Sequence, residues 1–500
     1  MRILFGMRNL HFWGRAFLLG TAVLGVLLAA GAMCALGQSS PPAPNPAVNP
    51  DRLPISTSSP EAAKVFEEGL HLRYDFHTEQ ALAKWREATK QDPNFARAWA
   101  YIVLVGVDPV EVKQAAEKAR LASQNASPGE KLLVKWAIST DEGRFLDAIA
   151  AMNDLLAMYP RDAQLNYEAG LWVRSQGDSE GAVKFTKRAL EVDPNFAGAL
   201  NTLAYQLAFM HEYDQAISYL KCYIEVEPRD ANPRDSMAEI LQMVGRLEES
   251  LAEYREALKL DPKYYSSHEG MGNDFALLGK QDRAREEYAK AASLALTPQD
   301  RLLCEIQSAV TYAREGNVKQ ARVELGAVLD EATKLQLNDL RSSIHRYLAL
   351  LAESPASAFQ QLDEAEAVLQ GPGNISGANR SRQLASTLST RARLAAEAGK
   401  LEMARAAVAR LEEMVKTNRS NAVERAYHGA NGALLAAESK TGTAIQELRE
   451  DPENPFSMSK LAELQAASGN ARDAAETRAR FKADYGTTLE DWLVVRKFRQ

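Results

Sequence analysis

Two His-Glu pairs are the side chains in this sequence that come closest to a catalytic motif. His211-Glu212 and His268-Glu269 begin like the zinc-binding pattern in which a second histidine follows four residues after the first. Neither pair has that second histidine, so neither supplies two zinc ligands from one helical face. We interpret both histidines as surface residues and predict no metal site.

Other motifs that carry chemistry are missing from the sequence. It contains no Walker loop, no GxSxG serine-hydrolase motif and no calcium-binding EF-hand pattern. Gly371, Gly373 and Gly377 do not follow a predicted strand, and Cys222 and Cys304 lie 82 residues apart without CxxC spacing. The sequence therefore predicts no catalytic residue, no cofactor and no enzyme.

Composition limits both the fold and the partners. The 500 residues are 46% hydrophobic and only 7% aromatic, which favours several helical domains or a helical repeat over one β-rich core. The 59 basic and 66 acidic residues give a net charge of −7, and nucleic-acid binding needs a basic surface instead. We expect protein partners and no nucleic acid.

The first 37 residues are predicted to be a signal peptide or an N-terminal membrane anchor. Three arginines precede the 22 uncharged residues 16–37, so the rest of the chain should be translocated. Cleavage after Gly37 leaves small residues where a signal peptidase favours them, whereas retention of residues 16–37 makes one membrane-spanning helix. Residues 38–60 hold seven of the 20 prolines and are predicted to form an extended linker.

Proline recurs at a nearly constant interval after this linker. The spacing is 32 to 36 residues, and the series is Pro93, Pro128, Pro160, Pro194, Pro228, Pro262 and Pro298. Because proline cannot continue a helix, each one is predicted to end a helix and start the next turn. The pattern indicates a repeated pair of helices.

Small residues occupy fixed positions in this period. With the proline as position 32, position 8 is Gly69, Gly170, Ala204, Ala238 or Gly272, and position 20 is Ala81, Ala148, Ala182, Ala216, Ser250 or Ala284. Helices that cross at short distance need such residues. Position 15 is Gly143, Gly177, Gly245 or Gly279, with His211 as the exception, and predicts a left-handed turn after the first helix.

A two-helix unit of this length, with these small residues and this proline, resembles the tetratricopeptide repeat (TPR). The resemblance implies an all-α, right-handed α-solenoid of about 11 to 12 hairpins. We predict an array over 61–298, with units 62–95, 96–128, 129–162, 163–196, 197–230, 231–264 and 265–298. Divergent hairpins follow over 299–486 with a loop near 371–379, and a capping helix over 487–500 starts at a Thr488/Asp491 capping box.

The resemblance also implies a binding surface, because the first helices of TPR hairpins line a concave groove. Carried over by position, the candidate residues for binding a protein are Tyr167, Glu168, Arg174, Asn201, Tyr205, Phe209, Asp235, Glu239 and Asn273. This mixture of aromatic, amide and charged side chains suits an extended peptide or a partner helix. A merely solvated helix face is the alternative interpretation.

Together, the resemblance and the N-terminal segment predict a non-enzymatic scaffold of an exported bacterial type. It would bind protein or peptide partners in the periplasm, soluble after cleavage or held in the inner membrane by residues 16–37. Two alternatives remain open, a membrane-anchored assembly factor of the cell envelope and a cell-envelope hydrolase that uses the divergent C-terminal half. The identity of the partner and the oligomeric state are not predicted.

Overall fold

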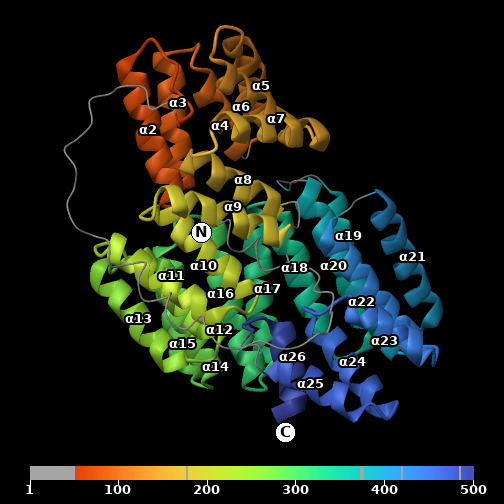
Figure 1. Ribbon diagram of the computed structural model, residues 1–500. Helices are drawn as coiled ribbons and strands as arrows, with labels where there is room; N and C mark the ends of the chain where they lie inside the picture. Colours follow the sequence, from red (N-terminus) through yellow and green to blue (C-terminus); the bar gives the residue numbers. More distant parts are fainter. Residues whose placement is uncertain are drawn as a thin grey trace, which may run out of the picture. The chain divides into compact units, whose positions relative to one another are not determined.

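Helix boundaries in this chain follow from residues that start and stop helices. The computed structural model describes residues 51–106, 108–175, 178–371, 375, 377–417, 420–482 and 486–499, and every regular element among them is an α-helix (Figure 1). Several helices begin at a hydroxyl cap followed by proline, as at Ser59-Pro60 and Ser127-Pro128. The side chain of the cap accepts a hydrogen bond from a backbone N–H that would otherwise be unpaired. Proline is tolerated next to it because an N–H in the first turn has no partner within the helix, so its absence loses no hydrogen bond.

The helices form two compact units, and the boundary between the units lies between Pro228 and Arg229 in the sequence. Unit 1 contains α2 (Pro60–Tyr74), α3 (Thr78–Gln91), α4 (Ala96–Val105), α5 (Pro109–Ser123), α6 (Pro128–Asp141), α7 (Phe145–Met158), α8 (Ala163–Ser175), α9 (Ser179–Val192), α10 (Ala197–Phe209) and α11 (Tyr213–Val226). These helices pack as five consecutive hairpins, from α2 with α3 to α10 with α11.

Unit 2 continues the same arrangement. It contains α12 (Asn232–Met243), α13 (Leu247–Leu260), α14 (Tyr265–Leu277), α15 (Gln281–Leu294), α16 (Pro298–Arg314), α17 (Val318–Lys334), α18 (Asn338–Leu350), α19 (Pro355–Gln370), α20 (Gly377–Glu397), α21 (Leu401–Thr417), α22 (Asn421–Ala437), α23 (Thr441–Arg449), α24 (Pro455–Ala467), α25 (Ala471–Lys482) and α26 (Leu489–Arg499). The described helices α2 to α25 form twelve hairpins. The predicted all-α solenoid of about 11 to 12 hairpins is therefore confirmed.

Close helix crossings explain the small residues of the repeat. A Cβ atom on Gly69 would lie 2.4 Å from Trp85 Nε1, and one on Gly272 would lie 2.6 Å from Tyr288 Cε1. The side chains of Ala182 and Ala216 are 0% exposed. Residues larger than these would push the paired helices apart, as the repeat pattern predicts.

Replacing Ala182 by leucine is expected to lower the free energy of unfolding by about 1 to 3 kcal/mol, because three extra carbons must enter a filled crossing between α8 and α9. A Cβ on Gly170 of α8 would already lie 3.2 Å from the Ala182 carbonyl oxygen. The urea midpoint measures the effect. Lys184→Leu, at an exposed position of the same helix, is the control, and equal midpoints for the two variants would contradict the close crossing.

The left-handed turns predicted after the first helix are confirmed. Gly143, Gly245 and Gly279 have φ angles of 69°, 76° and 76°, and His211 adopts 63° at the equivalent position. A residue with a Cβ is strained in this conformation, so glycine is favoured. Gly177 lies outside the described residues.

Two of the periodic prolines do not end a unit as predicted. Pro128 and Pro298 lie in the first turns of α6 and α16, after the caps Ser127 and Thr297. The expectation was wrong at these two positions because a proline in this phase can start the next helix as readily as it interrupts the previous one.

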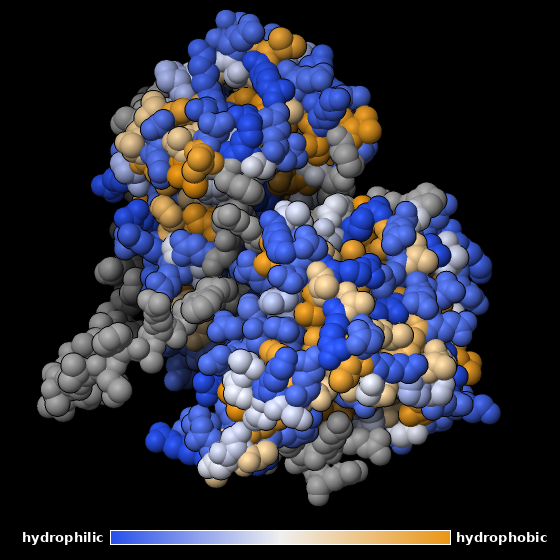
Figure 2. All heavy atoms as spheres, turned by 90° about the vertical axis from the view of Figure 1, so that its right-hand side faces the viewer, coloured by the Kyte–Doolittle hydropathy of each residue, from blue (hydrophilic) through white to orange (hydrophobic). Residues whose placement is uncertain are grey.

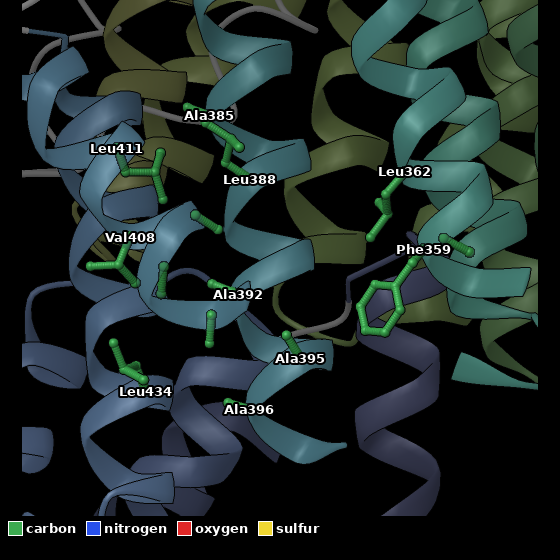
Figure 3. Close-up of a cluster of buried hydrophobic side chains, with 14 of the residues drawn as sticks. Phe359, Leu362, Ala385, Leu388, Ala392, Ala395, Ala396, Val408, Leu411 and Leu434 are labelled. Carbon is green, nitrogen blue, oxygen red and sulfur yellow. The ribbon is translucent and has the colours of Figure 1, made fainter. Parts of the chain in front are cut away.

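The C-terminal half departs from the 34-residue period because its helices are longer. Helices α16, α17, α21 and α22 have 17 residues each and α20 has 21, against 13 in α8 and 14 in α9. Since α20 begins at Gly377, the last residues of the predicted 371–379 loop are helical. Figure 3 shows the core around α20, where Leu388 and Ala392 lie among side chains from α19, α21 and α22.

The predicted signal or anchor, residues 1–37, lies outside the described residues, and so does the linker as far as residue 50. Of the remaining linker residues, 51–59 are described and are not helical, whereas Pro60, predicted as the last linker residue, is the first residue of α2. Among the described helices, none combines the length and the hydrophobicity needed to cross a bilayer.

Candidate functional site

Three of the predicted groove residues in unit 1 are buried. The side chains of Tyr167, Asn201 and Tyr205 are 2%, 1% and 3% exposed. The hydroxyl groups of Tyr167 and Thr202 share a hydrogen bond of 3.0 Å, and the Tyr167 ring lies 5.5 Å from the ring of Tyr74. Burial raises the pKa of Tyr167 to about 12. These side chains join first helices of unit 1 to one another.

Glu168 is also engaged inside unit 1. Arg73 of α2 donates from Nε and Nη2 to the two carboxylate oxygens of Glu168 in α8, each at 3.1 Å. The arginine and glutamate side chains are only 10% and 3% exposed. Burial by itself lowers the pKa of Arg73, but the Glu168 carboxylate raises it above its usual value. The pair therefore fixes α2 against α8 as a buried, charged contact.

Arg174 and Phe209 complete the predicted set in unit 1. The Arg174 guanidinium carbon lies 5.6 Å from the centre of the Phe209 ring, a cation–π distance. Burial lowers the pKa of Arg174 to about 10. Phe209 itself is half-buried, at the C-terminal end of α10.

The predicted residues of unit 2 lie on α12 and α14. Ser267 donates to Asp235 Oδ1 at 2.6 Å, and the Tyr288 hydroxyl donates to Asn273 Oδ1 at 2.8 Å. Burial and the neighbouring Glu239 raise the pKa of Asp235 well above its usual value. Glu239 is half-buried.

An extended stretch, residues 53–58, lies on the first helices of unit 1 and is called here the N-terminal segment. Four side chains hold it and form what is called here the segment site: Asp92, Arg97, Glu130 and Asp162. The backbone N–H of Leu53 donates to Asp162 at 2.8 Å, and that of Ser56 donates to Glu130 at 2.8 Å. Arg97 Nη1 donates to the Leu53 carbonyl oxygen at 2.9 Å.

Asp92 holds the other end of the N-terminal segment. Its Oδ2 atom accepts from the Thr57 hydroxyl at 2.5 Å and from the Ser58 backbone N–H at 3.2 Å. Burial would raise the pKa of Asp92, but the hydrogen bonds from Thr57, Asn94 and Ser58 lower it below its usual value. Asp92 is therefore held as an anion that accepts from the segment.

In unit 2, helix α26 packs against first helices of the hairpins, whereas in unit 1 the extended N-terminal segment lies there. Leu489 is 0% exposed and packs with Leu302 of α16 and Ile344 of α18, and Val494 packs with Leu461 of α24. Arg314 donates to the Thr487 carbonyl oxygen at 2.9 Å, across 173 residues of sequence. The C-terminal helix thus packs on the middle of unit 2 as well as on the final hairpin, where it was expected.

Charged groups accompany this apolar contact. Arg346 Nε lies 3.8 Å from Glu490 Oε1, and burial raises the pKa of Glu490 although Arg346 opposes the shift. The predicted capping box is present, since Thr488 Oγ1 accepts from the Asp491 N–H at 3.1 Å and Asp491 accepts from the Thr488 N–H at 3.0 Å. The sequence predicted helix α26 but gave no sign of its contacts with α16 and α18.

Comparison with known proteins identifies the repeat. The tetratricopeptide repeat family matches residues 236–264, which cover most of α12 and all of α13. The chain therefore contains a tetratricopeptide repeat. No curated protein matches it.

Solved structures similar to this TPR chain cover part of it. A crystal structure of MamA protein is 20% identical over 34% of this chain and 92% of its own, with a TM-score of 0.29. TTC0263, a thermophilic TPR protein of Thermus thermophilus, is 25% identical over 40% of this chain and 99% of its own, with a TM-score of 0.32. PilW, described as a type IV pilus biogenesis factor, is 16% identical over 41% and 93%, with a TM-score of 0.33.

The residues of this TPR protein that resembled catalytic groups have structural partners. His268 Nδ1 lies 2.6 Å from Glu287 Oε2, and His211 Nδ1 lies 2.9 Å from the Tyr213 hydroxyl at a turn. Cys304 is buried in α16, and burial raises the pKa of its thiol, which keeps it protonated and unreactive. Cys222 lies on α11.

The exposed hydrophobic side chains lie outside the set of groove residues predicted from the sequence. Figure 2 shows a face on which hydrophilic residues are the majority and hydrophobic residues form small groups. The large exposed hydrophobic residues of the described chain include Val110 and Leu121 on α5 and Leu146 on α7. None of the groove residues predicted from the sequence is among them.

The sequence did not predict the segment site. Its four residues join one short peptide to several hairpins, and a 34-residue period describes contacts only between neighbouring hairpins. One signal was present: Leu53 is an isolated leucine in a proline-rich linker, and it is followed by Ser56, Thr57 and Ser58. This pattern is typical of a short peptide that binds by one anchor and its main chain.

Proposed function

We propose that this TPR protein is a non-enzymatic scaffold that binds a protein partner through the first helices of its hairpins, outside the cytoplasm. The observation that supports it most is that the first helices of unit 2 already hold an amphipathic helix, α26. Leu489, Trp492 and Leu493 supply its apolar face, and Arg346 lies near Glu490. Binding of one apolar helix face in a groove is a common mode of partner recognition.

The residues predicted from the sequence enter this proposal in two groups. Tyr167, Glu168, Arg174, Asn201, Tyr205, Asp235 and Asn273 are buried and shape the helices within their own unit. Phe209 and Glu239 are only half-buried, and we assign them, each within its unit, to contact with a partner.

The location outside the cytoplasm is proposed from the apolar segment of residues 16–37. A mature protein that begins at Gln38 would be a soluble scaffold. One that begins at Met1 would be a membrane-anchored assembly factor. N-terminal sequencing of the protein from its native cells distinguishes the two.

Replacing Leu489 by aspartate is expected to release α26 and to increase capture of partners from envelope extracts at least threefold, because a charge in the apolar contact with α16 and α18 is unfavourable. Affinity purification with mass spectrometry measures the capture. A synthetic peptide of residues 486–499, added in excess, should displace the captured proteins.

Arg472→Asp is the control, since this side chain is 89% exposed on the adjacent α25 and also gains an acid. Hydrogen exchange of α16 and α18 should rise in Leu489→Asp and stay unchanged in Arg472→Asp. Partners that are captured equally by all three proteins and are not displaced by the peptide would contradict the proposed function.

A further inference from the structure

Two carboxylates of the segment site, Asp162 and Glu130, each bind both the start of a helix and the N-terminal segment. Asp162 accepts from the Leu165 N–H with Oδ1 at 3.0 Å, which caps α8, and from the Leu53 N–H with Oδ2. Glu130 uses Oε2 for the Ser127 cap of α6 and Oε1 for the Ser56 N–H. One oxygen of each carboxylate thus belongs to the TPR fold, and the other is available to a peptide.

Most of the contacts involve the main chain of the N-terminal segment. The backbone N–H groups of Leu53, Ser56 and Ser58 donate, and the Leu53 carbonyl oxygen accepts from Arg97. Any extended peptide without proline at the three donor positions offers the same groups. Arg97 also lies 5.3 Å from the centre of the Phe66 ring and donates from Nη2 to Gln164 Oε1 at 3.3 Å, so contacts outside the N-terminal segment hold its guanidinium in position.

Side-chain selection comes from two positions. Leu53 is 3% exposed and lies against Gly129, where a Cβ atom would come within 2.6 Å of Leu53 Cδ1. Four residues later, the Thr57 hydroxyl donates to Asp92. The site thus favours a leucine followed, four residues on, by a hydroxyl side chain.

The charges of the segment site further restrict which peptides can bind to it. Asp92, Glu130 and Asp162 contribute three carboxylates, Arg97 contributes one cation, and residues 53–58 are uncharged. An acidic residue between the leucine and the hydroxyl would be repelled by the carboxylates.

We propose that the segment site is a binding site for an extended, non-acidic peptide with a leucine anchor and a hydroxyl four residues later, and that residues 53–58 occupy it as a built-in competitor. This inference rests on the proposed scaffold function and names a ligand class for unit 1. A segment attached directly to α2 has an effective concentration on the order of millimolar, so a partner peptide binds well only where the segment is displaced.

The experiment uses the full chain with residues 53–58 replaced by a Gly-Ser sequence, and a fluorescently labelled synthetic peptide of residues 51–59 as the probe. Fluorescence anisotropy should give half-saturation at a probe concentration at least tenfold lower for the replaced chain than for the unmodified chain. A probe with Ser56→Glu should bind at least tenfold more weakly. If the replaced chain loses helicity, the double variant Leu53→Ala/Thr57→Ala takes its place.

The repeat supplies a matched control. Asp92 Oδ1 accepts from the Asn94 N–H at 2.9 Å, and Asp193 Oδ1 accepts from the Asn195 N–H at 3.1 Å, but only Asp92 is bonded to the N-terminal segment. In the replaced chain, Asp92→Asn should weaken probe binding at least fivefold and Asp193→Asn should leave it unchanged. Absence of saturable binding, or equal effects of the two variants, would overturn the proposal. Neither result affects the capture experiment on α26, which concerns unit 2.

Discussion

Replacing Glu168 by alanine is expected to lower the free energy of unfolding of unit 1 by about 3 to 5 kcal/mol, because it leaves the Arg73 guanidinium buried without its counter-ion. The two side chains are 10% and 3% exposed and joined by two hydrogen bonds of 3.1 Å. Urea denaturation followed by tryptophan fluorescence measures the loss, since Trp85, Trp99, Trp136 and Trp172 all lie in unit 1.

An exposed pair in the same unit provides the comparison. Glu68 bonds Lys84 at 2.6 Å, but the two side chains are 41% and 35% exposed. Water already solvates these charges, so Glu68→Ala should change the midpoint little. The double variant Arg73→Met/Glu168→Leu, which removes both buried charges, should recover most of the lost stability. A Glu168→Ala midpoint equal to that of Glu68→Ala would contradict the buried-pair interpretation.

Replacing Asp274 by asparagine is expected to remove a loss of stability that the wild-type protein suffers as the pH rises. Burial raises the pKa of Asp274 to about 7, although hydrogen bonds from Ser250 and Gln242 oppose the shift. An unfolded aspartate titrates near pH 3.9, so the folded state binds the extra proton between about pH 4 and pH 7. The stability that Asp274 contributes is complete below about pH 4 and is lost as the pH rises through about 7, by up to about 4 kcal/mol.

Urea denaturation followed by circular dichroism at about pH 5 and about pH 8 measures this difference. Asparagine keeps an oxygen for the Gln242 amide, which donates to Asp274 Oδ1 at 2.8 Å. The free energy of unfolding of Asp274→Asn, relative to that of the wild type, should therefore increase from the lower to the higher pH. That of Asp282→Asn should not, because the Asp282 side chain is 90% exposed. Parallel pH profiles for wild type and Asp274→Asn would show that Asp274 is ionised throughout.

The hairpins could be predicted from the sequence because each depends on contacts a few residues to one repeat apart. Gly69 against Trp85 and the left-handed Gly143, Gly245 and Gly279 each repeat a local requirement, so the period reveals them. The divergent half was harder because helices such as α20, with 21 residues, lose the period while keeping the same packing.

The contacts that define the candidate sites could not be predicted in this way. Arg73 meets Glu168 across 95 residues, and Arg314 meets Thr487 across 173. Such contacts depend on how small rotations between successive hairpins add up, and no single repeat records that sum. For this reason the sequence indicated the positions of Tyr167 and Tyr205 on their helices but not their burial.

A row of hairpins that touch only their neighbours unravels from its ends, one hairpin at a time. In unit 2 the last helix binds back onto α16, so the final hairpins cannot open freely without breaking contacts in the middle of the row. Melting of this unit should therefore be more nearly all-or-none than in an open array, and its refolding slower, because distant parts of the chain must meet before the end is secured.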